Sequence, residues 1–391
     1  MNRIREIVAT PVSVPFTKPE RWAFGEHRGM SSIIVQMHTE DGRVGLGEVL
    51  PGGPGPKALL AAIEEATPLL IGREATDIEA NVRRLMYVGG WYMFARTGNL
   101  IIAGLETAMW DILGQHLGVP LYRLFGGKLR PRISYMYWTQ AGAPVHERVA
   151  EAREAVRKGF RTIYTKGGWD DEADVEIIAK LREALGPQIR LRLDANESWS
   201  VGTAVRMLRR LEPYDLEFVE QPVRLDDLDA MCRIRGTTAV PIGANQSGWT
   251  GQRVLEIIRR GAADVIVTDP MQEGGLSAFR RTVGMCEIAG LPVVHHAFSG
   301  LTIAMTASMH VLCASSNCLL DHQAYAPMFL GGDVTTVPHD ISGGSAAIPD
   351  VPGLGVRLDQ DRLAEAARRF RDDGFYSMFD EDAEITWIPT R

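Results

Sequence analysis

Short apolar runs alternate with amphipathic helical patterns from about residue 131 onward. Strands that alternate with helices in this way form βαβ units and a parallel sheet, and eight such runs predict a closed barrel. The pattern therefore predicts an α/β fold with a barrel of the (β/α)8 type, which the family resemblance described below changes to a modified barrel. The eight predicted strands are "RISYMYW", "FRTIYTK", "IRLRLD", "LEFVE", "AVPIGAN", "ADVIVTD", "LPVVHH" and "CLLDH".

The first part of the chain has a different pattern. "IREIVATPV" and "SIIVQMHTEDGRVGLGEV" are strand-like, with a hairpin turn at Asp41-Gly42, and helical periodicity follows over roughly residues 57–71, 74–88 and 100–117. We predict three parts: an N-terminal α+β domain, the barrel, and a C-terminal segment that returns to the first domain. Their predicted bounds are 1–128, 129–323 and 324–391.

Composition narrows the possible partners. The chain has 391 residues, 45% hydrophobic and 23% charged, with a net charge of -7, which argues against nucleic acid and anionic membrane surfaces. No run reaches the roughly 18 apolar residues of a membrane span. The four cysteines have no metal-binding spacing and are typical of a reducing compartment, so we expect a cytoplasmic protein.

A polar residue stands at the end of almost every predicted barrel strand. The intervals between them are roughly 25 residues, about one strand–helix unit, so these side chains should converge on one mouth of the barrel. Any one of them alone is equally well explained as the N-cap of the following helix. The series consists of Lys166, Asp194, Glu220, Asn245, Asp269, the pair His295-His296, and Asp321.

Asp194, Glu220 and Asn245 end three successive predicted strands. Hard oxygen donors without Cys or His suit Mg²⁺. With a neutral amide as the third ligand, the protein ligands carry a charge of -2 and just cancel the metal, whereas a third acid would leave the site negative. The alternative is that Asn245 is only a helix cap.

Several stretches, in order along the chain, resemble the mandelate racemase and muconate lactonizing branch of the enolase superfamily. They are "AGLETAMWDILGQHLGVPLYRLFGG", "KGG", "LDAN", "VEQP", "TDPMQEGG" and "PGLGVRLD". The resemblance implies an N-terminal capping domain on a (β/α)7β barrel and one Mg²⁺. An Asn at the third ligand, followed by Asp269, His296 and Asp321, is similar to glucarate dehydratases. The chain departs from the family at Tyr164, where a lysine is usual, and lacks the Asn pair that follows the histidine in glucarate dehydratases.

The resemblance implies a role for each residue. Lys166 is the expected base, and Tyr164 shares its strand face. His296, oriented by Asp269, is the expected acid, although the roles of His295 and His296 could be exchanged. We expect Asp321 to hydrogen-bond a substrate carboxylate. The remaining substrate-binding candidates are Arg21, Trp22, His27, Arg28, Asn196 and His295.

These residues predict removal of the proton α to a carboxylate, followed by loss of a β-hydroxyl to give a 2-keto-3-deoxy acid from an acid sugar. The same residues would serve a racemase or epimerase, which transfers a proton between the two faces of one carbon. A catalytically inactive binding scaffold is a third possibility. We expect a small carboxylate substrate and a homo-oligomer.

Overall fold

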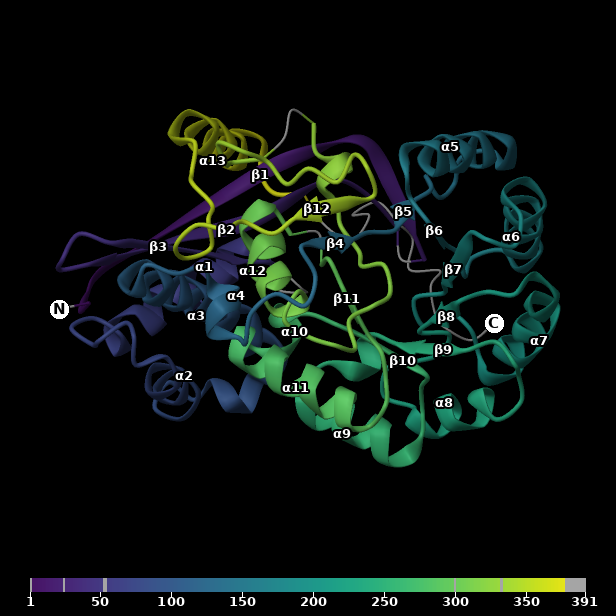
Figure 1. The fold of residues 1–391 in the computed structure, drawn as a ribbon, viewed down its shortest axis with the longest axis horizontal. Helices are drawn as coiled ribbons and strands as arrows, with labels where there is room; N and C mark the ends of the chain where they lie inside the picture. The colour runs from purple at the N-terminus through teal and green to yellow at the C-terminus, as the bar shows by residue number, and fades with distance from the viewer. Residues whose placement is uncertain (1, 24, 52–54, 299, 331–332, 377–391) are drawn as a thin grey trace.

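The computed structural model describes residues 2–23, 25–51, 55–298, 300–330 and 333–376. The last 15 residues of the predicted C-terminal segment therefore lie outside the described residues. A three-stranded antiparallel sheet with helices and a seven-stranded parallel sheet with helices lie side by side (Figure 1).

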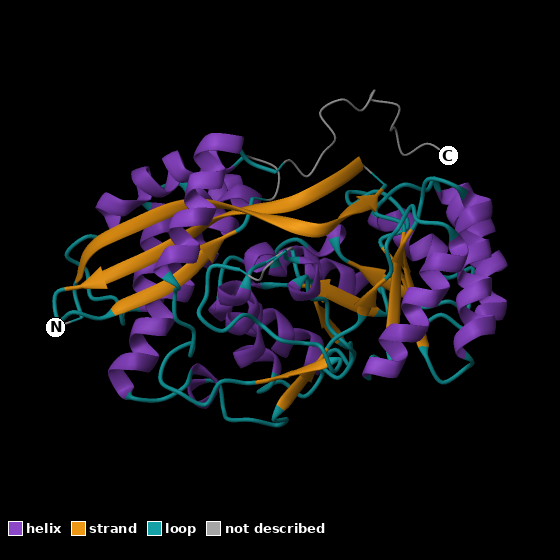
Figure 2. Cartoon of the chain, turned by 90° about the horizontal axis from the view of Figure 1, so that it is seen from above, coloured by secondary structure: helices purple, strands orange, loops and turns teal. Residues whose placement is uncertain are grey.

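The N-terminal domain is built on one antiparallel sheet in the order β1-β2-β3. Its strands are β1 (Ile4–Trp22), β2 (Gly25–Thr39) and β3 (Val44–Val49), and its helices are α1 (Pro56–Ala66), α2 (Ile78–Tyr87) and α3 (Ala95–Leu117). Glycines let α3 pack directly on β3, because a Cβ on Gly47 would collide with the carbonyl oxygen of Gly104. The long β1–β2 ribbon extends from this sheet across to the barrel (Figure 2).

The barrel sheet has the strand order β11-β10-β9-β8-β7-β6-β5, and each pair of neighbours is parallel. Its strands are β5 (Tyr137–Trp138), β6 (Thr162–Lys166), β7 (Arg190–Asp194), β8 (Phe218–Glu220), β9 (Ile242–Ala244), β10 (Val265–Thr268) and β11 (Val293–His295). The helices that follow α3 are α4 (Leu121–Leu124), α5 (Val145–Lys158), α6 (Asp171–Leu185), α7 (Val201–Leu211), α8 (Leu228–Arg235), α9 (Gly251–Arg260), α10 (Pro270–Glu273), α11 (Leu276–Ile288) and α12 (Thr302–Leu312).

The eighth predicted strand, "CLLDH", is not a regular strand. The segment is held by separate backbone hydrogen bonds on its two sides: His322 forms a parallel bridge with Tyr135, and the Gln323 N–H donates to the His295 carbonyl at 3.1 Å. The parallel sheet therefore has seven strands, and the eighth position is filled by irregular chain.

After the barrel, the chain returns toward the first domain. Strand β12 (Ser345–Ala347) pairs antiparallel with β4 (Arg132–Ser134), and helix α13 (Gln360–Asp373) packs against β1 (Figure 1). Helices α1 to α13, as far as the chain is described, include none that is long and apolar enough to cross a membrane.

Buried carboxylates of the N-terminal domain accept hydrogen bonds from backbone N–H groups of two barrel helices. Glu48 of β3 accepts from Leu301 and Ala304, both at 3.0 Å, at the start of α12. Glu106 of α3 accepts from the N–H groups of Leu276 and Ser277 at the start of α11. The first N–H groups of a helix have no partner within the helix, so these acids supply the missing acceptors and fix the two domains together.

Burial raises the pKa of Glu48 from 4.5 to about 7, more than the two backbone hydrogen bonds lower it. The folded protein therefore holds a proton on Glu48 between these two pH values, where the unfolded chain has already lost it. Stability from this group is full below about pH 4.5 and falls as the pH rises to about 7.

We expect Glu48→Gln to remove this pH dependence. The free energy of unfolding of the variant, relative to wild type, should increase by about 3 kcal/mol between about pH 4 and pH 8, because wild type loses this stability as the buried Glu48 ionises and glutamine does not ionise. Denaturant titrations at several pH values measure this difference, with the exposed Glu40→Gln as the control. A constant difference across the range would contradict the prediction.

Candidate functional site

Strand register places Lys166, Asp194 and Glu220 in one row. Lys166 pairs with Asp194 between β6 and β7, and Asp194 pairs with Glu220 between β7 and β8. All three side chains are buried. The Lys166 Nζ donates to Asp194 Oδ2 at 2.7 Å, and the Tyr164 hydroxyl donates to the same oxygen at 2.6 Å. Tyr164 thus faces inward on the side of Lys166, and its hydroxyl binds Asp194.

Two buried acids beside one lysine shift the pKa of both kinds of group. Burial raises the pKa of Glu220, and the adjacent Asp194 carboxylate raises it further. Burial lowers the pKa of Lys166, but the charges of Asp194, Glu20 and Glu220 outweigh it and raise that pKa overall. A divalent cation between the two acids would relieve their repulsion and weaken the hold on the lysine proton.

Asn245 follows β9, and its amide Nδ2 donates to the Val267 carbonyl at 3.0 Å. Because Nδ2 is engaged in this way, Oδ1 is the atom of the amide that could act as a ligand. Gln221 holds this turn: its Oε1 accepts from the N–H groups of Asn245 and Ser247 at 3.1 and 3.0 Å.

The structure describes no cluster of three or more His, Cys, Asp or Glu side chains arranged for a metal. This follows from the chemistry of the predicted set, which has only two acids. Two buried neighbouring carboxylates and an amide oxygen fit Mg²⁺, a hard cation that prefers oxygen and keeps several waters. Asp194, Glu220 and Asn245 are therefore the residues that would hold it.

His296 follows β11, and its Nδ1 lies 3.1 Å from Asp269 Oδ2. The imidazole is 17% exposed, and the Phe298 ring packs edge-on against it with centroids 5.3 Å apart. Asp269 also caps α10, because its Oδ1 accepts from the Gln272 N–H at 2.8 Å. Asp269 thus caps α10 with one oxygen and contacts His296 with the other.

Two predicted site residues do not join the others. His295 is buried toward α11, with its ring 6.4 Å from that of Phe279, and burial lowers its pKa to about 4. The expectation that Asp321 faces the mouth is wrong. Its Oδ2 accepts from Thr162 at 2.7 Å and from Arg190 at 2.9 Å. These are the first residues of β6 and β7, about 13 Å along the strands from Lys166 and Asp194.

Gln323 occupies the place at the mouth that was predicted for Asp321. Its Nε2 approaches the two Glu220 oxygens at 3.2 and 3.4 Å, and its Oε1 accepts from the Ala297 N–H at 3.3 Å. The predicted series of strand-end polar residues ended at Asp321, two residues before the residue that lies at the mouth. The spacing of polar residues could not show this, because the segment is not a regular strand.

The β1–β2 ribbon brings a different set of side chains than predicted. His27 is buried, and its Nε2 lies 2.8 Å from Glu20 Oε2; the sequence analysis did not select Glu20. Trp22 lies against His27, with ring centroids 6.2 Å apart. Arg21 is exposed over the Trp169 ring at 5.5 Å, and Arg28 is 77% exposed beside Glu26.

Asn196 lies directly after β7. Its N–H donates to Asp194 Oδ1 at 2.8 Å, and its buried side-chain Oδ1 has no partner among the described residues. Asn196 is therefore placed to orient Asp194, through its backbone.

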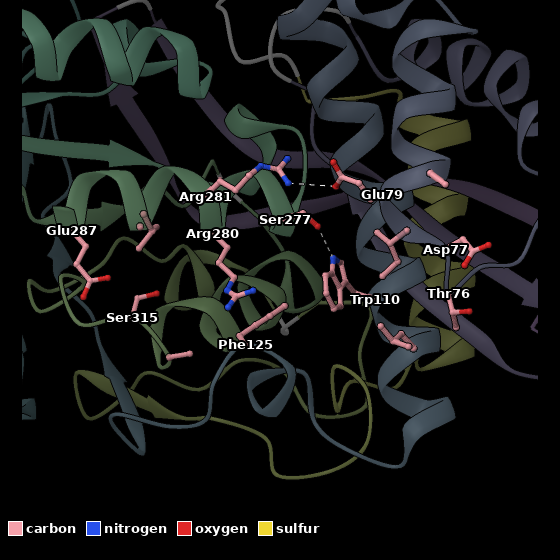
Figure 3. Close-up of a pocket in the computed structure, with 16 residues that line it drawn as sticks. Thr76, Asp77, Glu79, Trp110, Phe125, Ser277, Arg280, Arg281, Glu287 and Ser315 are labelled. Atoms are coloured by element: carbon pink, nitrogen blue, oxygen red, sulfur yellow. Dashed lines mark hydrogen bonds and ion pairs between the residues drawn. The ribbon is translucent and has the colours of Figure 1, made fainter. Parts of the chain in front are cut away.

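A separate cleft of about 830 Å³ lies between α2, α3 and α11 (Figure 3). Trp110 donates to Ser277 there at 3.2 Å, and Arg281 pairs with Glu79 at 3.4 Å. None of the predicted site residues lines it.

Comparison with known proteins agrees with this geometry. Residues 147–362 match the family described as "Enolase C-terminal domain-like", and residues 4–126 match the N-terminal domain of mandelate racemase / muconate lactonizing enzyme. The chain belongs to this family of the enolase superfamily.

Relatives of different activity are about equally similar. L-Ala-D/L-Glu epimerase of Bacillus subtilis is 31% identical over 90% of this chain and 96% of its own. Arabinonate dehydratase of Saccharolobus solfataricus is 31% identical over 84% and 88%. A dipeptide epimerase from Cytophaga hutchinsonii, solved with Mg and D-Ala-L-Val, has a TM-score of 0.86 at 28% identity, covering 93% of this chain and 98% of that one.

The predicted fold is confirmed: an enolase-superfamily capping domain on a parallel barrel of seven strands. Enzymes of this superfamily remove the proton α to a carboxylate, and this chain is one of them. Strained backbone conformations are concentrated in the loops at the mouth of its barrel. Six non-glycine residues in the described ranges have positive φ, and five lie in loops that follow barrel strands: Asn196, Glu197, Gln221, Thr250 and Phe298.

We expect Asn245→Asp to tighten Mg²⁺ binding on the order of tenfold, or ~1.4 kcal/mol, because a third negative charge joins the ligands. Turnover should slow, since the added charge opposes negative charge developing on the substrate. Asn245→Leu should weaken Mg²⁺ binding. Isothermal titration with Mg²⁺ measures both affinities without substrate, and unchanged affinity in both variants would remove Asn245 from the ligand set.

Proposed function

We propose that this enzyme dehydrates an acid sugar to a 2-keto-3-deoxy acid. The observation that carries the proposal is the placement of two proton-transfer groups on either side of the acid row. Lys166 ends β6 and His296 follows β11, while β7 to β10 lie between them in the sheet. Asp194, Glu220 and Asn245 stand at the ends of three of those intervening strands.

In the proposed reaction, the substrate carboxylate lies over this row, with Lys166 facing one side of the α-carbon. Mg²⁺ held by Asp194, Glu220 and Asn245 would stabilise the charge that the carboxylate oxygens gain. Lys166 accepts the α-proton. His296 donates a proton to the β-hydroxyl, which leaves as water, and Asp269 holds the imidazole ring through its Nδ1. The enol product then loses the proton of its α-hydroxyl, gains a proton at its β-carbon, and becomes the keto acid.

Gln323 adds a hydrogen-bond donor that needs no protonation. Because its Oε1 is engaged by the Ala297 N–H, its Nε2 is directed toward Glu220. We propose that it orients Glu220 and meets a substrate oxygen, the role first assigned to Asp321. Dehydratases among the relatives, such as arabinonate dehydratase, support an acid-sugar substrate.

A racemase or epimerase is the second candidate, favoured by the epimerases among the relatives and by the same Lys166 and His296 on two sides of one carbon. The substrate decides between the two: without a β-leaving group, only exchange or inversion at the α-carbon is possible.

We expect mutations of the two proton-transfer groups to have different effects on dehydration and on proton exchange. His296→Asn should reduce keto-acid formation by about 10²–10⁴-fold, the usual contribution of a general acid, and retain exchange of the Lys166-facing α-proton with D₂O. Lys166→Ala should abolish both. A keto-acid assay across a panel of sugar acids, combined with proton NMR in D₂O, provides the measurement.

The exposed His146→Asn is the matched control and should behave as wild type. Full exchange in both site variants would mean that neither residue is the base. If no sugar acid lost water while a 2-substituted acid was inverted, the racemase assignment would replace dehydration.

A further inference from the structure

The capping domain contributes a buried acid, Glu20, near the end of β1. It is only 3% exposed, and it pairs across the ribbon with His27, whose Nε2 lies 2.8 Å from Glu20 Oε2. On its other side, the Tyr325 hydroxyl donates to Glu20 Oε1 at 3.3 Å. An ionised carboxylate accepts about four hydrogen bonds, so these two contacts leave acceptor positions open.

Glu20 lies on the Lys166 side of the mouth. The Tyr325 ring that binds it packs on Trp138, with centroids 4.8 Å apart, and the Lys166 Nζ lies 4.9 Å from the centroid of the same Trp138 ring. The charge of Glu20 also contributes to the raised pKa of Lys166. Glu20 and the predicted base therefore flank one aromatic pair at the edge of the barrel mouth.

The two arginines of the ribbon do not lie in the interior beside Glu20. Arg21 is exposed on the Trp169 ring, and Arg28 is 77% exposed beside Glu26. Their charges are therefore screened by water. At the strand position where this family often has a second lysine, Tyr164 provides a neutral hydroxyl that is already bound to Asp194.

We propose that Glu20 selects a hydroxyl group at the substrate end remote from the reacting carboxylate, so that the enzyme prefers a polyhydroxy monocarboxylate over the matching dicarboxylate. A hydroxyl donates a hydrogen bond to a carboxylate, whereas a second carboxylate has no proton to donate and is repelled in a buried site. The inference rests on the proposed function and narrows its substrate to aldonic acids.

Pairs of sugar acids that differ only at the end remote from the reacting carboxylate test this preference directly. Gluconate and glucarate differ only in whether carbon 6 is a hydroxymethyl or a carboxylate, and galactonate and galactarate form a second pair. Binding is measured by isothermal titration with Mg²⁺ in a Lys166→Arg background, which keeps the positive charge but removes the base. In at least one pair, the monocarboxylate should bind at least tenfold more tightly.

Glu20→Gln in that background should reduce the preference to less than about threefold. Glu20→Asp, which keeps the charge and controls for disruption of the ribbon, should retain it. Glu26→Gln is the matched control on the same ribbon: its side chain is 40% exposed, and the preference should not change. Equal or tighter dicarboxylate binding, an unchanged preference in Glu20→Gln, or no binding of any pair member would overturn the inference.

Keto-acid formation by the wild-type enzyme is scored separately. Dehydration of dicarboxylates alone would overturn the role of Glu20 and leave the proposed function intact. Preferential binding of monocarboxylates without loss of water would support the role of Glu20 and remove dehydration.

Discussion

Parallel pairing of β6, β7 and β8 forces Lys166, Asp194 and Glu220 into one buried row, and the rest of the site follows from that constraint. Burial raises the pKa of Glu220, and repulsion from the neighbouring Asp194 carboxylate raises it further. A structure that keeps such a row needs a cation to balance it. Lys166 provides one positive charge from the chain, and the remaining imbalance is what a divalent metal would neutralise.

Neutral groups surround this row where charged ones would also fit. Tyr164, Asn245 and Gln323 each present an amide or hydroxyl, and each is oriented by a second hydrogen bond or by the acid that it binds. An asparagine at the third position therefore belongs to a wider pattern. Charge near the two acids is kept low, so that an anionic substrate is not opposed by the protein.

The fold and most of the site were predictable because they depend on periodicity. Strand ends recur once per βα unit, and this spacing selected Lys166, Asp194, Glu220, Asn245, Asp269 and the pair His295-His296, all of which lie at the ends of strands in one sheet. The family resemblance, not the spacing, chose His296 from the pair. Spacing failed at Asp321 because the eighth segment is irregular, so that its last polar residue is Gln323. Glu20 was missed for another reason: its position depends on how a long ribbon from another domain bends, which no local pattern encodes.

The buried acids Glu48 and Glu106 affect how such enzymes can be recombined. Each sits in the capping domain but completes a helix that belongs to the barrel. A chimera that takes its capping domain from one parent and its barrel from another would fold well only if the parent of the capping domain had acids at the positions of Glu48 and Glu106. Without them, the first turns of α11 and α12 would have buried N–H groups with no acceptor. Under the role proposed for Glu20, the capping domain would carry both the substrate preference and the acids that complete these two barrel helices.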